Sequence, residues 1–365
     1  GPYCSFMASS KNALCHCAIS IATSHQTRRM SLMHAYRIIR GQGPQSLHRI
    51  EVPPSSLGEN QVLLAVKAAS LNYRDLLVAH GQMGAGEARI PLSDAAGQVV
   101  AVGSAITDFS IGDAVLPIFF PRWTEGFPSE QALSLSLGGN IDGVLTTHLV
   151  VDQSALVHAP RTLSWEQAST IACAGVTAWH ALFELGALPD GAHVLIQGTG
   201  GVSTWAVQLA LAAGLRVTVL SGREEGIEHM VALGAHAAIN YNTDPNWDET
   251  VLRTTGGVDL VMDIGGAGTI ARSLRSLRPG GQVVTIGGVA GGFALSIDPF
   301  SLIGGKSLTG VVVGSKKMTK ALIRFIDEHA IVPVIDTIFP FAEAAAAFAR
   351  MEHGRPIGKV VIAIN

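Results

Sequence analysis

The sequence predicts an α/β protein built from a β-rich domain and a doubly wound parallel-sheet domain. Short β-prone runs at residues 34–40, 61–69 and 96–102 are separated by clusters of Gly, Pro and Asn, which is typical of a β-rich domain. From about residue 192, apolar strands alternate with helical segments, which indicates βαβ units around a parallel sheet. The alternation stops near residue 314, so we expect the C-terminal segment to rejoin the first domain.

The elements of the second domain can be placed one by one. Helices fit at residues 202–213, 224–233 and 267–277, each followed by Gly or Pro as a stop signal, and a later helix fits around 320–329. We expect strands at residues 193–197, 216–220, 237–239, 258–262, 282–286 and 308–313. The predicted domains are therefore residues 31–156 with 314–365, and residues 157–313.

Composition limits the class of function. The chain has 365 residues, of which 48% are apolar and 15% charged, enough for two buried cores. The net charge is −3 and Lys and Arg are scattered, so we expect no nucleic-acid or membrane partner but a small molecule. No apolar run approaches the roughly 20 residues that cross a bilayer, and we predict a soluble, cytoplasmic protein.

The first thirty residues differ from the rest of the sequence. The opening Gly1-Pro2 is typical of a protease scar, and no acidic residue precedes Glu51. The Ser content and Arg28-Arg29 also fit an organelle transit peptide. We favour a tag or N-terminal extension that is disordered, with Met30 or Met33 as the natural beginning.

The cysteines argue against a metal centre. Of the four, only Cys173 lies in the body of the chain, where we expect a small buried residue. The body has no CxxC motif, no HExxH motif and no Cys/His cluster of the kind that binds zinc. We therefore predict a metal-free protein.

A glycine-rich turn predicts a dinucleotide site. The strand at 193–197 runs into Gly198-Thr199-Gly200-Gly201-Val202-Ser203 and then into an apolar helix. Gly198 allows the tight turn, Gly200 lets a pyrophosphate approach the backbone, and Gly201 and Val202 open the helix, whose N-terminus attracts phosphate. Ser203 stands at the third glycine position, where a small residue lets helix and strand pack closely.

The end of the second strand favours NADP(H) over NAD(H). An NAD site places a carboxylate there to bind the ribose 2′-hydroxyl, whereas this chain reads Leu220-Ser221-Gly222-Arg223. Arg223 would pair with a 2′-phosphate, beside Ser221. The alternative is that Arg223 is a solvated surface residue and Glu224 or Glu225 binds the ribose.

Several motifs resemble the medium-chain dehydrogenase/reductase superfamily, specifically its zinc-free quinone oxidoreductase-like (zeta-crystallin-like) branch. The resemblance extends over about residues 33–365. It rests on Asn72-Tyr73-Arg74-Asp75, Ser93-Asp94-Ala95-Ala96-Gly97, Phe109 to Val115, Cys173 to Trp179, the Gly198 turn, Asn240-Tyr241 and Gly358-Lys359-Val360-Val361. It implies a GroES-like catalytic domain and a Rossmann-type cofactor domain. The zinc-ligand stretches of zinc-dependent relatives are replaced here, and the loop at 121–143 stands where they have a four-cysteine lobe.

The resemblance also assigns roles to single residues. It implies that Thr177 binds the nicotinamide carboxamide and that Tyr241 and Lys359 lie toward the NADP phosphates. The alternatives are that Thr177 packs or caps a helix, Tyr241 covers a strand edge and Lys359 is a solvated charge. Asn72 and Tyr73 are expected to face the substrate as the catalytic residues, although Asn72 could simply cap the helix that follows.

One departure limits the substrate class. Many relatives have a tyrosine in a Gly-x-Tyr motif, a candidate proton donor in enoyl-thioester reductases, where this chain reads Gly81-Gln82-Met83. A thioester reductase is therefore doubtful, and Tyr73 is the nearer phenol. Two carboxylates, Asp75 and Asp94, could form an acid/base pair, although loop stabilisation is the simpler role.

These observations lead to one main hypothesis for function. Without zinc, alcohol oxidation has no Lewis acid, whereas reduction of a quinone or an α,β-unsaturated carbonyl needs only a hydrogen-bond donor and a proton. We predict an NADPH-dependent quinone or enone reductase. The alternatives are a zinc-independent alcohol or aldehyde oxidoreductase and a non-catalytic NADPH-binding protein. The strand at 308–313 falls last in its sheet, so we also predict a homodimer that covers this edge.

Overall fold

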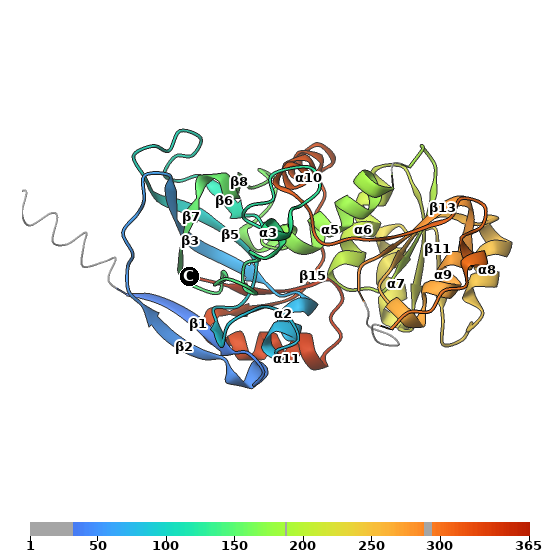
Figure 1. Ribbon diagram of the computed structural model, residues 1–365, viewed down its shortest axis with the longest axis horizontal. Coiled ribbons are helices and arrows are strands. Elements are labelled where there is room, and N and C mark those ends of the chain that lie inside the picture. The colour runs from blue at the N-terminus through green and yellow to red at the C-terminus, as the bar shows by residue number, and fades with distance from the viewer. Residues whose placement is uncertain (1–31, 187, 288–293) are drawn as a thin grey trace, which may run out of the picture.

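The computed structural model describes residues 32–186, 188–287 and 294–365. The N-terminal extension expected at residues 1–30 lies outside these ranges. The described chain forms two lobes side by side along the long axis, and the C-terminal segments, red in Figure 1, run back to the lobe formed by the N-terminal half. The C-terminal segment thus pairs with the sheet of the first lobe.

The first lobe is built on a mixed seven-stranded sheet. Its order is β15-β16-β3-β5-β6-β8, with β7 also paired to β3. A smaller sheet of order β2-β1-β4 flanks it. Most side chains of the central strand β3 are buried, as expected for a strand covered on both faces. The strands are β1 (Met33–Ile39), β2 (His48–Val52), β3 (Gln61–Ser70), β4 (Ala88–Arg89), β5 (Asp94–Val102), β6 (Ala114–Pro117), β7 (His148–Asp152), β8 (Leu156–His158), β15 (Ile335–Pro340) and β16 (Lys359–Ala363).

The second lobe holds a parallel six-stranded sheet of order β11-β10-β9-β12-β13-β14. The chain adds strands on one side of β9 and then on the other, so the strand order reverses between β9 and β12. A ligand crevice is expected at the carboxyl ends of the strands at such a switch point. The strands are β9 (His193–Gln197), β10 (Arg216–Ser221), β11 (Ala237–Asn240), β12 (Val258–Asp263), β13 (Leu277–Thr285) and β14 (Ser307–Gly310).

The helices of this lobe cover the sheet. In α6 (Gly201–Ala212) the chain is apolar on nearly all sides, and Trp205 at its centre is fully buried, because the helix packs between the sheet and the neighbouring lobe. α7 (Glu224–Leu233) has the predicted bounds and ends at Gly234 in the left-handed conformation. α9 (Ile270–Ser276) is shorter than predicted, and α8 (Trp247–Thr255) was not expected from the sequence.

The remaining helices connect or cap the lobes. α10 (Lys316–His329) starts four residues earlier than expected, because the Ser315 hydroxyl accepts a hydrogen bond from the Met318 amide and caps it. The edge strand predicted at 308–313 ends at Gly310. The other helices are α2 (Tyr73–Ala79), α3 (Glu130–Leu133), α4 (Trp165–Ala168), α5 (Val176–Trp179) and α11 (Ala344–His353).

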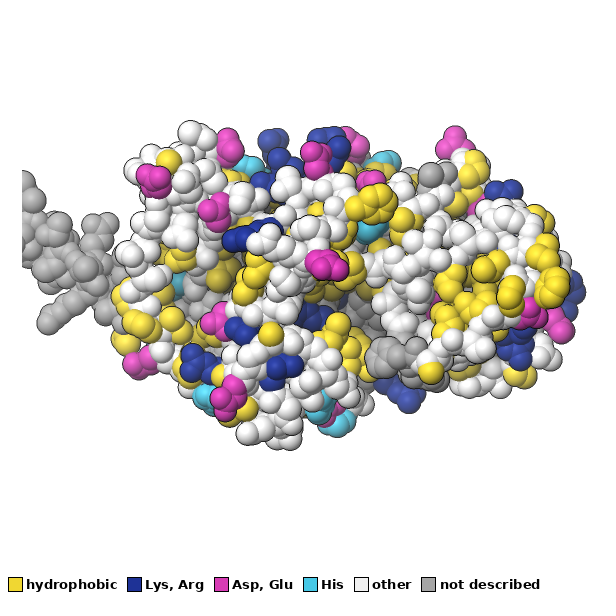
Figure 2. All heavy atoms as spheres, in the orientation of Figure 1, with side chains coloured by type: hydrophobic (Ala, Val, Ile, Leu, Met, Phe, Trp, Pro, Cys, Tyr) yellow, Lys and Arg dark blue, Asp and Glu magenta, His cyan; other side chains and the backbone are white. Residues whose placement is uncertain are grey.

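One apolar core joins the two lobes. It combines residues of the first sheet, such as Val62 and Val115, with Val194 of β9 and Trp205 of α6. The Trp205 indole also donates a hydrogen bond of 3.1 Å to the Thr170 carbonyl oxygen. On the face in Figure 2, basic and acidic side chains are scattered rather than gathered by sign. Within the described ranges, no helix has both the length and the apolar character needed to cross a membrane.

Candidate functional site

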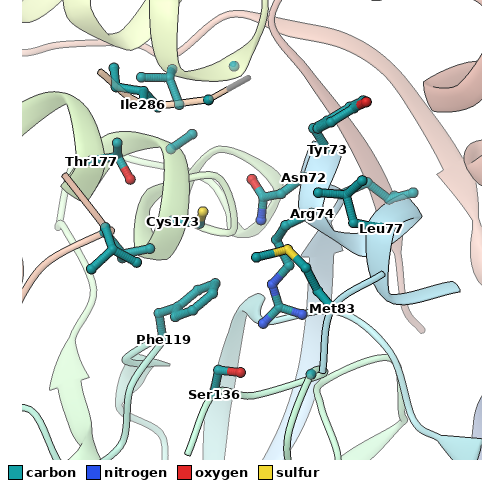
Figure 3. Close-up of a pocket in the computed structure, with 18 of the residues that line it drawn as sticks. Asn72, Tyr73, Arg74, Leu77, Met83, Phe119, Ser136, Cys173, Thr177 and Ile286 are labelled. Atoms are coloured by element: carbon teal, nitrogen blue, oxygen red, sulfur yellow. The ribbon is translucent and has the colours of Figure 1, made fainter. Parts of the chain in front are cut away.

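A cavity of about 800 Å³ lies between the lobes. The glycine-rich turn after β9 forms one wall, together with α5 and the start of β16. The start of α2 and residues between Phe119 and Asn140 complete the lining. Figure 3 shows Thr177 on one side of it and Arg74 and Met83 on the other, with Cys173 and Asn72 between them. The cavity thus combines a turn of the dinucleotide-binding type with a largely apolar chamber.

The turn has the geometry that a pyrophosphate requires. Gly198 has a φ of +82°, which favours glycine. The Ser203 hydroxyl donates a 2.6 Å hydrogen bond to the Gln197 carbonyl oxygen and closes the turn. A Cβ atom at Gly200 would meet open space, whereas one at Gly201 would lie 2.7 Å from Cδ of Lys359. Gly200, Gly201 and Val202 line the cavity at the N-terminus of α6, so the residues fit a dinucleotide phosphate.

Three predicted cofactor residues cluster outside this cavity, at the end of β10. The buried Ser221 hydroxyl accepts a hydrogen bond from the Arg223 amide. The Arg223 guanidinium donates to the Arg355 carbonyl oxygen and lies 3.5 Å from Glu225. Tyr241 is half exposed, and its ring packs against Gly222. Arg223 and Ser221 are thus adjacent, as a 2′-phosphate site needs, and Tyr241 covers the turn between them.

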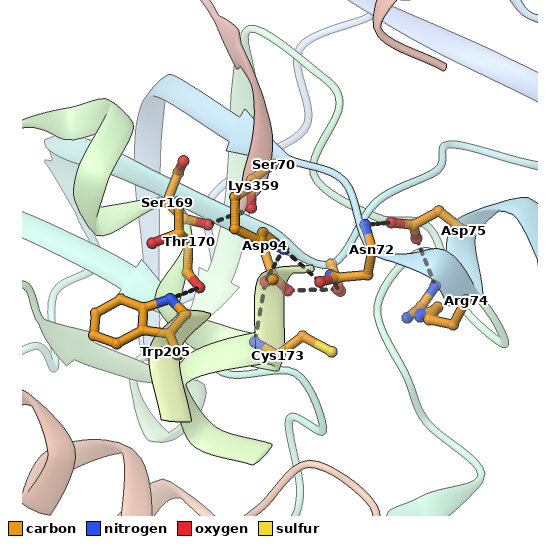
Figure 4. A network of polar contacts seen from close by, with 12 residues as sticks. Ser70, Asn72, Arg74, Asp75, Asp94, Ser169, Thr170, Cys173, Trp205 and Lys359 are labelled. Atoms are coloured by element: carbon orange, nitrogen blue, oxygen red, sulfur yellow. Dashed lines mark hydrogen bonds and ion pairs between the residues drawn. The ribbon is translucent and has the colours of Figure 1, made fainter. Parts of the chain in front are cut away.

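A buried polar network links the lobes (Figure 4). Lys359 is 2% exposed, and its ammonium donates to the side-chain oxygen of Asn72 and lies 3.5 Å from the Asp94 carboxylate. Asp94 also accepts hydrogen bonds from the Ser93 hydroxyl (2.6 Å) and the Cys173 amide (3.0 Å). The alternative of a solvated Lys359 is therefore wrong. The network fixes the Asn72 amide in the cavity wall.

Asn72 both caps α2 and lines the cavity. Its backbone amide donates a 2.7 Å hydrogen bond to the Asp75 carboxylate, and its side chain is 8% exposed. Asp75 is buried, and desolvation raises the pKa of its carboxyl to about 6 despite the opposing effect of Arg74. Neither Asp75 nor Asp94 lines the cavity, so loop stabilisation, not acid/base chemistry, is the role that their positions support.

The remaining predicted residues take different places in the wall. Thr177 is 4% exposed and lines the cavity from α5. Tyr73 is about half exposed and lies at the rim, with Met83 nearby and similarly exposed. Cys173 is partly exposed and lines the cavity, so the expectation of a simply buried residue is wrong. The sequence could not show this, because Cys173 comes to lie between the glycine-rich turn and Asn72 only when the chain folds.

The donors around Cys173 do not fit a zinc ion. A zinc site is built from three or four Cys, His, Asp or Glu ligands, and Cys173 is the only cysteine among the described residues. The polar neighbours of Cys173 in the network are Asn72 and Ser93, which supply an amide and a hydroxyl rather than zinc ligands. The Asp94 carboxylate already accepts hydrogen bonds from the Ser93 hydroxyl and the Cys173 amide and lies beside Lys359. Among the described residues, no group of three His, Cys, Asp or Glu side chains is placed to hold a metal ion.

Sequence reasoning missed Arg74, which lines the cavity, and Asp263, the buried residue that precedes Ile264 of the lining. Arg74 lines the cavity, with its guanidinium over the Phe119 ring at 4.5 Å. Asp263, at the carboxyl end of β12, is fully buried and accepts hydrogen bonds from Gln197, Thr269 and Ser273. A charged residue in the first turn of a helix is usually solvated, so the sequence offered no sign that Arg74 points inward.

Comparisons with known proteins agree with the fold. Residues 58–161 match the alcohol dehydrogenase GroES-like domain family, and residues 201–328 match the zinc-binding dehydrogenase family. A zinc-type alcohol dehydrogenase-like protein of Schizosaccharomyces pombe is 38% identical over 86% of this chain and 93% of its own. A putative alcohol dehydrogenase from Sinorhizobium meliloti superposes with a TM-score of 0.84 at 35% identity, over 92% of this chain and 99% of that one. An NAD-dependent alcohol dehydrogenase gives 0.82 at 28% identity, over 91% and 100%.

Proposed function

The chain belongs to the medium-chain dehydrogenase/reductase superfamily, as an alcohol dehydrogenase-like oxidoreductase, and from that premise we propose that it reduces quinones or α,β-unsaturated carbonyls with NADPH and without zinc. The observation behind this proposal is the cavity itself. It joins the glycine-rich turn to an apolar chamber, and the donors near Cys173 are an amide and a hydroxyl rather than metal ligands.

The preference for NADPH rests on the end of β10. Arg223 is the N-cap residue of α7, with Ser221 beside it. Of the nearest carboxylates, Glu224 accepts a hydrogen bond from Asn240, and Glu225 is largely exposed and lies 3.5 Å from the Arg223 guanidinium. A 2′-phosphate would gain charge-assisted hydrogen bonds here. A structurally similar alcohol dehydrogenase is NAD-dependent, so the fold alone does not select the cofactor. The proposed preference for NADPH over NADH therefore depends on Arg223 and Ser221.

The residues of the chain would divide the work as follows. When bound, the nicotinamide supplies a hydride to the electrophilic carbon of the acceptor. Thr177 offers its hydroxyl to the carboxamide. Lys359 engages the oxygen of the Asn72 amide, and one N–H of the amide nitrogen is directed at the Ser93 hydroxyl at 3.5 Å. The other N–H can donate to the acceptor oxygen, where negative charge develops.

One proton must reach the acceptor to complete the reduction. The Tyr73 phenol at the rim, or water reaching the cavity past it, can supply this proton. The apolar side chains that line the remainder of the chamber, including Phe119, Phe120 and Leu133, exclude most water and hold a planar acceptor in place. Asp75 and Asp94 support the wall without contacting the acceptor.

The test is NADPH oxidation by chelator-treated protein with 1,4-benzoquinone, a simple enone or a simple aldehyde, with NADH run in parallel. We expect turnover of the quinone or the enone, with a preference for NADPH. Turnover of the aldehyde alone, or activity restored by added zinc, would favour an alcohol or aldehyde oxidoreductase. Tight NADPH binding with no turnover of any acceptor would indicate a cofactor-binding protein.

A further inference from the structure

Arg74 places a cation in the substrate end of the cavity. It lies in the first turn of α2, its side chain is 13% exposed, and the guanidinium stacks over the Phe119 ring at 4.5 Å. Figure 3 shows it between Phe119, Met83 and Ser136, on the wall opposite Thr177. Stacking on an aromatic ring covers one face of a guanidinium and leaves its edge open. The N–H groups point out from this edge, where a planar acceptor can reach them.

Only part of the hydrogen-bonding capacity of Arg74 is used within the protein. One terminal nitrogen donates to Asp75 at 3.3 Å and the other to the Leu137 carbonyl oxygen. A guanidinium has five N–H donors, and among the described residues no further acceptor contacts this one. Nearby, the Ser136 hydroxyl donates to the side-chain oxygen of Asn140 at 2.7 Å, and both residues line the cavity.

The charges around the cavity favour an anion. Among the described residues that line it, the charged side chains are Arg74 and Lys359, and both are cationic. The carboxylates that balance them, Asp75 and Asp94, lie behind the wall. Lys359 is engaged with Asn72 and packs against Gly201 at the cofactor end. Arg74 is therefore the cation available to a substrate.

We propose that Arg74 binds a carboxylate of the substrate, so that the preferred acceptors are enones or quinones that also bear a carboxylate. The inference rests on the proposed function and specifies its substrate class. The planar guanidinium matches the two oxygens of a carboxylate, and the partly dehydrated cavity strengthens the pairing. The competing interpretation is that Arg74 serves only as the ion-pair partner of Asp75.

The test compares 4-oxo-2-pentenoate with its neutral amide, 4-oxo-2-pentenamide, as acceptors. The readout is the ratio of kcat/KM for the acid to that for the amide, because the intrinsic reactivity of the two compounds cancels between variants. We expect the ratio to fall about tenfold or more in Arg74→Met. Arg74→Lys keeps the charge beside Asp75 and loses the planar group, so it should fold even if Arg74→Met does not, with an intermediate ratio. Arg89→Met, which removes another arginine–aspartate pair outside the cavity, should retain the wild-type ratio.

An unchanged ratio in both Arg74 variants would overturn the inference and leave the reductase proposal intact. If the wild-type protein reduces none of 4-oxo-2-pentenoate, 4-oxo-2-pentenamide and 1,4-benzoquinone, the proposed function fails. The role of Arg74 is then tested by ligand binding instead of turnover. Calorimetry with the unreactive 4-oxopentanoate should show binding at least about tenfold tighter to the wild-type protein than to Arg74→Met, with Arg74→Lys intermediate, and the wild-type protein should bind it more tightly than 4-oxopentanamide. Equal affinities would exclude a carboxylate site.

Discussion

The ammonium of Lys359 donates a hydrogen bond to the side-chain oxygen of Asn72, although 287 positions separate the two residues. The pairing of β16 with β3 explains the contact. The two strands are antiparallel, with Val361 opposite Ser70, and extending this register past the end of β3 places residue 359 opposite residue 72. The C-terminal strand therefore positions an amide that the N-terminal half presents to the cavity.

Replacing Lys359 with Met should impair both stability and turnover. The Asp94 carboxylate would remain buried without its ammonium, which we expect to lower the free energy of unfolding by about 3 kcal/mol. Freed from Lys359, the Asn72 amide could rotate, and kcat should fall at least about tenfold. Urea denaturation and steady-state kinetics measure the two effects.

Lys306→Met, which removes a partly buried lysine bonded to a backbone carbonyl, is the control. A raised KM for NADPH with normal kcat and stability would instead place Lys359 at the phosphates.

Replacing Gly200 with Ala should separate cofactor binding from folding. Gly200 has a negative φ and open space at its Cβ position, so the substitution should leave the free energy of unfolding within about 0.5 kcal/mol. The added methyl group would nevertheless occupy the place where the pyrophosphate approaches the backbone. We expect the Kd for NADPH to rise at least about tenfold in a fluorescence titration. Gly310→Ala, with equally open space outside the cavity, should bind NADPH normally. Normal binding by Gly200→Ala would argue against this turn as the phosphate site.

The sequence predicted the regular elements best where local signals agree. β9 and α7 have the predicted bounds because a strong apolar run and a clear glycine stop define them. α8 was missed because its threonines have low helix propensity, and packing against α9 stabilises it instead. The sequence predicts a helix to residue 277 and a strand from 282, yet β13 already starts at Leu277 and continues through Gly280, which has a φ of +79°, with a register shift against β12.

The candidate site was predictable to a similar extent. The glycine-rich turn is a contiguous motif, so its residues and their place after β9 followed from the sequence. The inward direction of Arg74 and the contact of Lys359 with Asn72 depend on how distant strands and the lobes pack. No spacing in the sequence encodes either one.

Replacing Arg223 with Ala should change cofactor preference rather than turnover. Removing a guanidinium that pairs with a 2′-phosphate should raise the Kd for NADPH about tenfold to a hundredfold, while the Kd for NADH changes little. Parallel titrations with the two cofactors measure the effect. Arg253→Ala, which removes an arginine from the last turn of α8, controls for the loss of one positive charge. Equal effects on NADPH and NADH would leave the preference for NADPH without support.

Asp75 should make stability depend on pH. Burial raises the pKa of its carboxyl from 3.8 to about 6 in the folded protein, so the folded state binds more protons than the unfolded state between these values. Its contribution to stability is therefore present below pH 3.8 and is lost as pH rises to about 6. We expect the stability of the wild-type protein relative to Asp75→Asn to fall by up to about 3 kcal/mol across this window. Urea denaturation of both proteins at several pH values isolates the effect, since other groups titrate in both. A relative stability that does not change with pH would contradict the prediction.

The outer edge of β14 favours a homodimer. β14 is an outer strand of its sheet, so one of its edges has no neighbouring strand within the described chain. Exposed apolar side chains lie close to it in sequence, with Phe300 at 77% exposure and Ile303 at 62%. A second copy that pairs along β14 would cover both the edge and these side chains, so we propose a homodimer.

Light scattering coupled to size exclusion at micromolar concentration should give twice the 38.1 kDa chain mass. Phe300→Asp with Ile303→Asp should give monomers, whereas Ile111→Asp, at an exposed apolar position in the other lobe, should not. A monomeric wild-type protein would mean that β14 remains an open edge.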